Sequence, residues 1–128
     1  MLRIKKQNLF KQLWETHLSD YVTAVAWSPD GTQLAASSDA GEVILYTPTT
    51  GKSTCLQSPQ GESVDALAIS ADGQFLAAGG QAGTVWIWQI DGDSPTLLTT
   101  LDYARTWINR LQWHPSSPEL AFSFGRCV

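Results

Sequence analysis

The chain has 128 residues, of which 43% are hydrophobic and 16% charged, a composition typical of one globular domain with a packed core. Its formal net charge of −4 argues against a nucleic-acid-binding surface, which needs clustered Lys and Arg side chains to displace counterions. No run approaches the ~18 apolar residues of a membrane span, and no secretory signal follows the N-terminal basic residues, so we expect a cytoplasmic protein without a membrane partner.

The N-terminal segment, residues 1–16, is a basic arm that we expect to end in a strand. A short basic arm is typically solvated, so it is assigned no binding role. The range from Leu9 to Glu15 precedes the first repeat and predicts the outermost strand of a blade. The alternative is an amphipathic helix from Leu2 to Trp14, in which three leucines have near-helical spacing. Half of the eight Lys and Arg residues lie in this segment: Arg3, Lys5, Lys6 and Lys11.

One sequence unit recurs along the rest of the chain. The stretch VTAVAWSPDGTQLAASSDAGEVILY, residues 22–46, returns as VDALAISADGQFLAAGGQAGTVWIW, residues 64–88, after 64 − 22 = 42 positions, with 12 of 25 positions identical. A third copy, INRLQWHPSSPELAFSFG, begins at Ile108. A period of about 40 to 45 residues is typical of a propeller blade. We therefore divide the chain into repeat units at residues 17–58, 59–102 and, truncated, 103–128.

Each complete unit predicts four short antiparallel strands. Apolar and β-branched runs alternate with turns rich in Gly, Pro and Asp, such as Ser28-Pro29-Asp30-Gly31. Four strands joined by hairpins make one twisted sheet of the kind that propellers repeat radially, which indicates an all-β fold. In the first unit the strands are expected at Val22 to Trp27, Leu34 to Ser37, Val43 to Tyr46 and Ser53 to Gln57.

The apolar runs are continuous, which favours strands that are buried on both faces between neighbouring sheets. The alanine pairs at residues 35–36 and 77–78 suit the crowded inner strands. Trp86 and Trp88 occupy fixed positions of the repeat, so they are interpreted as core residues and not as an aromatic ligand cage. Cys55 and Cys127 lack the spacing of metal ligands and are also interpreted as packing residues.

The segments SPDG, LAAS or LAAGG, and GTVWIW at residues 83–88 together resemble the tryptophan-aspartate (WD) repeat family. The resemblance implies a partial WD-repeat β-propeller made of consecutive four-stranded blades. Family propellers are closed rings, commonly of seven blades, that bind protein partners and rarely catalyse a reaction. The chain is therefore expected to be a non-catalytic scaffold for protein partners of unknown identity.

Several marks of the family are absent. His17 lies one place early for the Gly-His pair, Ala40 and Ala82 stand where the family has a turn Asp, and Trp88 is followed by Gln89. We therefore expect the internal hydrogen-bond network that braces the family's blades to be missing, so that apolar stacking holds the sheet together.

The chain holds about two and two-thirds blades, whereas a closed ring takes 4 to 8. One hypothesis is that it is the N-terminal piece of a longer propeller, and the other is that a short protein closes its ring by homo-oligomerisation. The functional alternative is a fragment of an enzymatic or ligand-binding propeller whose working residues lie outside this chain.

Catalytic, metal and cofactor sites have no support in the sequence. The segment Gly51-Lys52-Ser53 lacks the Gly that a phosphate-binding loop needs five residues earlier. His114 occupies the turn position of Ser28, and the turn aspartates Asp30 and Asp72 are expected to bind their own backbone. We expect no enzyme activity, no metal and no cofactor.

The resemblance implies a binding rim, formed by the loop into each inner strand and the loop between the second and third strands. Tyr21 and Trp107 fall at equivalent places in this rim, and both residue types are favoured anchors in protein interfaces. The candidate partner-binding residues are Tyr21, Thr23, Asp39, Ser63, Asp65, Gln81, Trp107 and Asn109.

Overall fold

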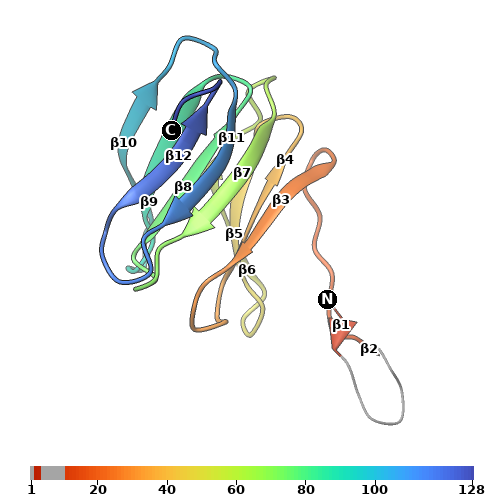
Figure 1. The fold of residues 1–128 in the computed structure, drawn as a ribbon. Coiled ribbons are helices and arrows are strands. Elements are labelled where there is room, and N and C mark those ends of the chain that lie inside the picture. The colour runs from red at the N-terminus through yellow and green to blue at the C-terminus, as the bar shows by residue number, and fades with distance from the viewer. Residues whose placement is uncertain (1, 4–10) are drawn as a thin grey trace.

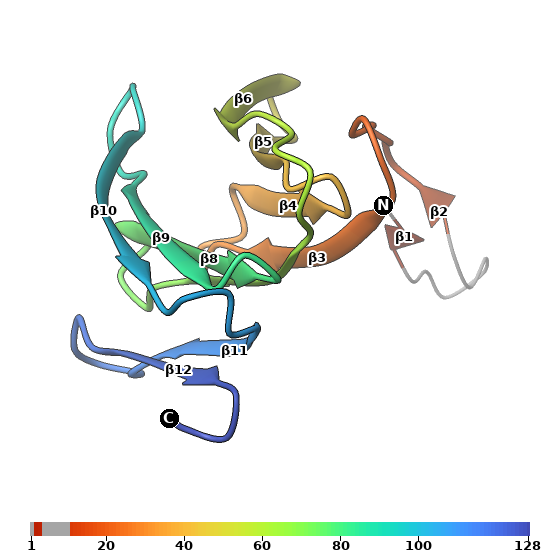
Figure 2. The same ribbon diagram turned by 90° about the horizontal axis from the view of Figure 1, so that it is seen from above.

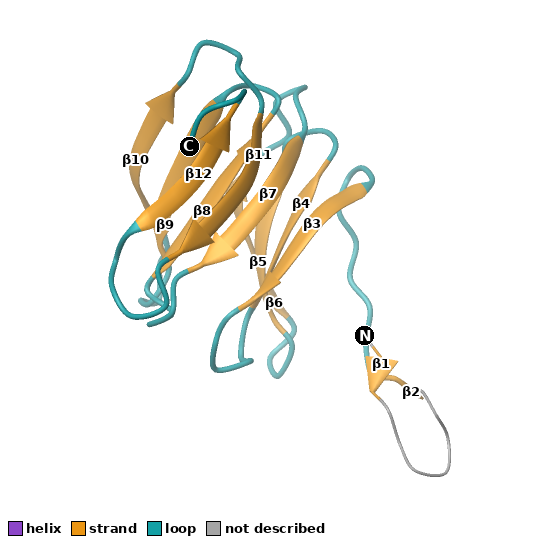
Figure 3. Cartoon of the chain, viewed as in Figure 1, coloured by secondary structure: helices purple, strands orange, loops and turns teal. Residues whose placement is uncertain are grey.

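The structure, a computed structural model, describes residues 2–3 and 11–128, and these residues form strands, turns and loops without a helix (Figures 1 and 3). The strands in chain order are β1 Leu2–Arg3, β2 Lys11–Gln12, β3 Val22–Trp27, β4 Leu34–Ser38, β5 Val43–Thr47, β6 Lys52–Gln57, β7 Val64–Ile69, β8 Phe75–Gly80, β9 Thr84–Gln89, β10 Thr96–Asp102, β11 Ile108–Trp113 and β12 Leu120–Phe124.

The strands form three successive antiparallel sheets that fan out around one edge, together with a two-stranded N-terminal sheet (Figure 2). Blade 1 is β3-β4-β5-β6, blade 2 is β7-β8-β9-β10, and blade 3 is the pair β11-β12, while β1 pairs with β2. The inner strands contact each other in sequence, β3 with β7 and β7 with β11. The expectation of an all-β fold with consecutive four-stranded blades is confirmed, and these sheets do not close a ring.

The strands of blade 1 match their predicted ranges to within one residue at each end. Hydrogen bonds in the hairpin between β3 and β4 explain why β3 ends at Trp27. Ser28 Oγ donates to Asp30 Oδ1 at 2.7 Å, and the Thr32 N–H donates to the same carboxylate oxygen at 3.0 Å. Gly31 has a φ of 73°, which a side chain disfavours. The same turn recurs in blade 2, where Ser70 Oγ donates to Asp72.

The main apolar core lies between blades 1 and 2. Leu76 and Val64 are fully buried, and burial of such a side chain contributes about 1.5–3 kcal/mol. Trp86 and Trp88 belong to this core with 9% and 3% exposure, so their assignment to packing is confirmed. The core residues are Ala35, Val43, Leu45, Val64, Leu76, Ala78, Trp86, Trp88 and Ile90.

Hydrogen bonds join blades 1 and 2 in addition to this stacking. The hydroxyls of Thr23 and Ser37 both donate to the carbonyl of Val64, Ser37 at 2.9 Å. Where the family has a turn Asp, the Ala40 carbonyl accepts main-chain bonds from Gln60 and Gly61 at 2.8 and 3.0 Å. These polar contacts between blades add to the apolar stacking, and the predicted absence of the family's network within each blade stays a prediction.

The prediction that the two cysteines are packing residues is wrong, because both are exposed. Cys55 lies on β6, the outermost strand of blade 1, whose only neighbour among the described strands is β5. Cys127 follows β12 and reaches back to it through a backbone bridge with Phe124. An outer strand does not have the two covered faces of an inner one, so a cysteine there is not forced into the core.

The N-terminal segment differs from both alternatives for it. Lys11 and Gln12 are a strand, but they pair with Arg3 and Leu2 of β1, and residues 13–16 have no regular structure. Leu9 and Phe10 lie outside the described residues. The helix predicted from Leu2 to Trp14 is contradicted at its described residues, since 2–3 and 11–12 are strands and 13–14 have no regular structure, while residues 4–10 lie outside the described part of the chain.

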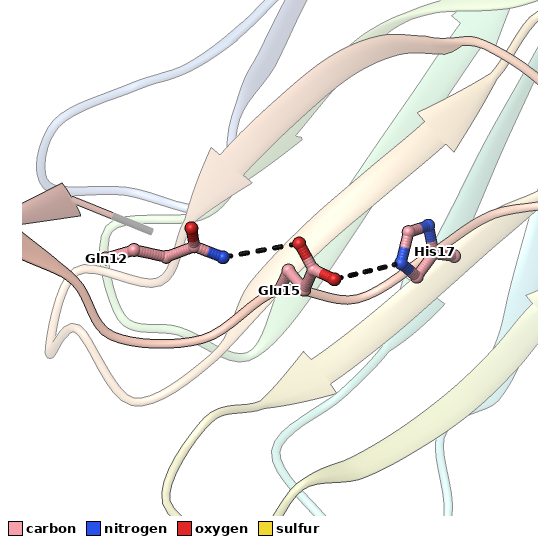
Figure 4. Close-up of polar contacts among 3 residues, drawn as sticks. All are labelled: Gln12, Glu15 and His17. Atoms are coloured by element: carbon pink, nitrogen blue, oxygen red, sulfur yellow. Dashed lines mark hydrogen bonds and ion pairs between the residues drawn. The ribbon is translucent and has the colours of Figure 1, made fainter.

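Three exposed side chains connect along this segment (Figure 4). Gln12 Nε2 donates to Glu15 Oε2 at 3.2 Å, and Glu15 Oε1 lies 3.5 Å from His17 Nε2. The His17 side chain is 81% exposed, so its ion pair contributes at most about 1 kcal/mol when the ring is protonated. His17 thus takes part in a surface contact.

Candidate protein-interaction surface

The loop into the inner strand and the turn after the second strand meet in both complete blades. In blade 1 the Asp39 N–H donates to the Tyr21 carbonyl at 2.8 Å. In blade 2 the Gln81 N–H donates to the Ser63 carbonyl at 3.0 Å. We call this edge, with the loop before β11, the rim. The Tyr21 side chain is 83% exposed, which is more than any other large apolar residue of the described chain except Val128.

Trp107 is fixed at the rim by a hydrogen bond between blades. Its Nε1 donates to Asp65 Oδ2 at 2.9 Å, while Ser63 Oγ donates to Asp65 Oδ1 at 2.6 Å. Asp65 therefore accepts from both neighbours and holds the indole in one orientation. The residue is nevertheless 48% exposed, which leaves a large oriented surface for a partner. A side chain that is already ordered loses little entropy when it binds.

The predicted rim residues occupy two levels. Thr23 is half-buried and donates to Val64 of the next blade, and Ser63 is 3% exposed. These two side chains lie beneath the exposed rim residues, and their hydroxyls form hydrogen bonds there. The other six residues reach the surface at least in part: Tyr21, Asp39, Asp65, Gln81, Trp107 and Asn109.

Glu62 was not predicted from the sequence as part of this surface. Its Oε1 lies 3.7 Å from Arg105 Nη1, across the loop that enters β11. Ala104 and Arg105 have φ values of 52° and 62°, which residues other than Gly adopt at a cost of about 1–3 kcal/mol each. A Cβ at Gly83 would lie 2.7 Å from the Arg105 N, so this loop packs directly on that glycine. A shallow hollow of about 470 Å³ results, lined by Glu62, Ala82, Thr84, Asp102, Ala104 and Arg105.

The carboxylates with shifted pKa values lie at the opposite end of the inner strands. The Thr32 N–H, with the hydroxyls of Ser28 and Thr32, lowers the pKa of Asp30 to about 2. The pKa of Asp72 is also lowered, first by Ser70 and then by the Gln74 N–H. Both groups stay ionised to bind their own turns, which is a structural role.

His114 stands in the corresponding turn of blade 3. The backbone N–H of His114 donates to the Glu119 carbonyl at 2.7 Å. The backbone N–H of Ser28 donates to the Gln33 carbonyl in the same way at 2.9 Å. The Nδ1 of His114 accepts the Ser116 N–H at 3.1 Å. The interpretation of His114 as a turn residue is confirmed.

Among the residues that the structure describes, no three His, Cys, Asp or Glu side chains lie together in a way that could hold a metal ion. The same part of the chain has no helix of the length and apolar character that a bilayer span requires.

Comparison with known proteins identifies what the repeat resembles. The family model described as "WD domain, G-beta repeat" matches residues 8–47 and 53–89, which is more than half of the chain. No curated protein sequence matches the chain.

Solved structures share its fold. The β-propeller domain of Cps50 (Swd1) from Myceliophteria thermophila superposes with a TM-score of 0.74 at 21% identity, covering 88% of this chain and 35% of that one. U3-55K gives 0.74 at 19% identity, covering 84% and 34% of the two chains, and the WD40 repeats of RRP9 give 0.74 at 20% identity, covering 84% and 33%. The chain thus spans about a third of the length of these proteins, and identities this low show a common fold alone.

Proposed function

Because the chain belongs to the WD40-repeat family of β-propellers, we propose that it is a non-catalytic scaffold that binds a protein partner through the rim. The observation that carries the proposal is the indole of Trp107, which is half exposed yet fixed by Asp65. Propellers of this family commonly mediate protein interactions and are generally not catalysts. The partner is a protein whose identity the rim chemistry does not name.

The aromatic residues give the rim its binding capacity. Tyr21 and Trp107 precede the first residue of β3 and β11, so the repeat places them on the same edge. Trp and Tyr are enriched at the energetic centres of interfaces, where truncation to Ala costs at least about 2 kcal/mol. Exposed Asp39, Gln81 and Asn109 around them supply the polar groups that typically form the border of an interface.

The test is to replace Trp107 by Ala in a tagged protein and to capture partners from an extract of the cells that make it. We expect the partner that the wild type captures to be lost, and its Kd, measured by calorimetry, to rise at least about 30-fold. The melting temperature should fall by only a few degrees, since the residue is half exposed. A large loss of stability would instead place Trp107 in the core.

Leu97→Ala is the matched control. Leu97 is 52% exposed, similar to Trp107, but it lies on β10, the outermost strand of blade 2. Partner capture should be unchanged in this variant. Equal loss of capture in both variants would contradict the rim as the binding surface.

A further inference from the structure

The outer edge of blade 2 is an open strand. β10 is seven residues long, longer than any other described strand, and every one of its residues is exposed. Its only neighbour among the described strands is β9. Figure 2 shows β10 at the outside of the fan, on the opposite side of its sheet from β7, through which blade 2 contacts blades 1 and 3. The edge thus lies away from the faces on which blades stack, and β10 comes from the interior of the sequence.

Blade 1 leaves β10 uncovered on the face that the two blades share. Leu97 pairs with Trp88, so the two side chains lie on the same face of the sheet. Trp88 is 3% exposed in the core between blades 1 and 2, whereas Leu97 is 52% exposed. The apolar cover that blade 1 gives to β9 therefore ends before it reaches β10.

Edge strands are usually protected against pairing with other chains by charged side chains, by proline or by a bulge. β6, the edge of blade 1, starts with Lys52 and has three half-buried residues, among them Leu56, which packs against the core. β10 has no proline and carries no charge before its last residue, Asp102. It has a bulge at Leu98, but from Thr99 to Asp102 it pairs regularly with β9. β10 is therefore the less protected of the two edges.

The open edge presents a defined set of hydrogen-bonding groups. In an antiparallel pair, alternate residues of a strand direct their N–H and C=O groups to the neighbour, and the residues between them direct theirs outward. β10 thus presents main-chain donors and acceptors at the spacing of an extended chain, and an extended peptide satisfies them. Threonines, which favour strand pairing, stand at positions 96, 99 and 100.

Carboxylates at both ends of β10 discriminate between the extended chains that could pair with it. Asp91 and Asp93 precede the strand, and Asp102 ends it. Within the described part of the chain, none of the three forms an ion pair. Antiparallel pairing of β10 with β10 of a second copy would bring Asp102 of each copy to the end that carries Asp93 of the other, and like charges oppose such pairing. A segment with Lys or Arg near its ends meets the opposite charge at both.

We propose that β10 is a second docking site, which receives an extended segment of another protein as the fifth strand of blade 2, and that this segment carries Lys or Arg near both ends. Main-chain hydrogen bonds provide the contact along the strand, and the basic side chains pair with Asp93 and Asp102. The site is separate from the rim and does not depend on Trp107.

A synthetic peptide of alternating Thr and Val residues with Lys at both ends is the probe. Added at up to about 1 mM to the isotope-labelled 128-residue chain, it should shift the NMR signals of the β10 amides and slow their hydrogen exchange, while the β6 amides stay unchanged. A peptide with Glu in place of Lys should bind about tenfold more weakly. Absence of binding, binding at β6, or equal affinity of the two peptides would overturn the proposal.

N-methylated forms of the probe test the main-chain pairing. Methyl groups on one set of alternate amides remove the donors that face β10 and should abolish binding. Methyl groups on the other set leave those donors free and should preserve it. An equal effect of the two sets would show that the peptide does not bind as a strand.

Charge variants of the chain test the recognition of the basic ends. Asp93 is exposed in the turn before β10, and Asp93→Lys should weaken binding of the Lys peptide and strengthen that of the Glu peptide. Glu119→Lys makes the same charge change in an exposed turn of blade 3 and should alter neither affinity. The same response to both variants would leave only the net charge of the protein as the cause and would contradict the pairing with Asp93.

Two further variants separate this site from the rim. Trp107→Ala and Leu97→Ala should both bind the Lys peptide as the wild type does, since neither removes a main-chain group of β10 or a carboxylate at its ends. Loss of the peptide from Trp107→Ala, with the fold intact by circular dichroism, would assign the peptide to the rim and overturn the second site. Dimers in sedimentation that the peptide dissociates would make a second copy the occupant and would overturn it as well.

Discussion

Asp30 shows how a single carboxylate secures the hairpin between β3 and β4. Its pKa of about 2 lies below the ordinary value of about 3.9 because the Thr32 N–H and the Ser28 hydroxyl donate to the ionised form. A lowered pKa in the folded state contributes stability above about pH 4 that is lost as the pH falls toward about 2. We expect Asp30→Asn to lower the melting temperature at pH 7 and to have a much smaller effect near pH 2.

Carboxyl carbon chemical shifts followed by NMR between about pH 1 and 6, roughly one unit or more beyond both pKa values, give the direct measurement. Ser28→Ala removes one donor and should raise the pKa of Asp30. Titration of Asp30 near pH 4 in the wild type would contradict this account of the turn.

The sequence predicted the turn residues, whose role is local, and the rim position of Tyr21 and Trp107, whose role in binding stays a prediction. The Ser-Asp turns follow from residues two apart, and Tyr21 and Trp107 follow from equivalent positions in the repeat. Glu62 was missed because its ion pair with Arg105 depends on two consecutive left-handed residues, which backbone preference opposes. Cys55 was misplaced because exposure on β6 depends on what covers an outer strand, which a local apolar pattern does not encode.

At the scale of elements, the packing of β8 on β11 depends on Gly79. A Cβ there would lie 2.6 Å from Ile108 Cγ2, so one strand or the other must move. Overpacking of this kind typically costs about 1–3 kcal/mol, and we expect Gly79→Ala to lower the free energy of unfolding by that amount in urea denaturation. Gly92→Ala is the control, since its Cβ would meet nothing within 4 Å.

A double-mutant cycle identifies the cause of that loss. In an Ile108→Ala background the Cγ2 atom is gone, so Gly79→Ala should cost less there than in the wild type. An unchanged cost would mean that the glycine serves its own backbone conformation and not the approach of β11.

The strands of the blades were predictable because each apolar run ends at a turn with its own chemistry. The N-terminal strands were not, because β1 and β2 are two residues each and exist through their pairing with one another. Neither the strand nor the helix proposed for that segment takes account of this partner. Short elements that depend on contacts distant in sequence carry little pattern of their own.

At the scale of the molecule, the fan behaves as an array in which each blade contacts only its neighbours. Stability in such arrays is approximately a sum of unit terms and nearest-neighbour interfaces. Among the described sheets, blade 2 is the one with a blade on each side, since β7 contacts both β3 and β11. The repeat predicted this stacking, whereas the Ser37–Val64 hydrogen bond depends on the relative placement of two sheets, which the repeat does not encode.

Equivalent leucines should therefore contribute unequally. Leu76 in blade 2 is fully buried, whereas Leu120 at the same position of blade 3 is half-buried. We expect Leu76→Ala to lower the free energy of unfolding by about 2–5 kcal/mol, and Leu120→Ala to lower it by less than about 2 kcal/mol. Urea denaturation of the two variants measures both losses. Equal losses would show that the blades unfold as one unit in which position along the array has no influence.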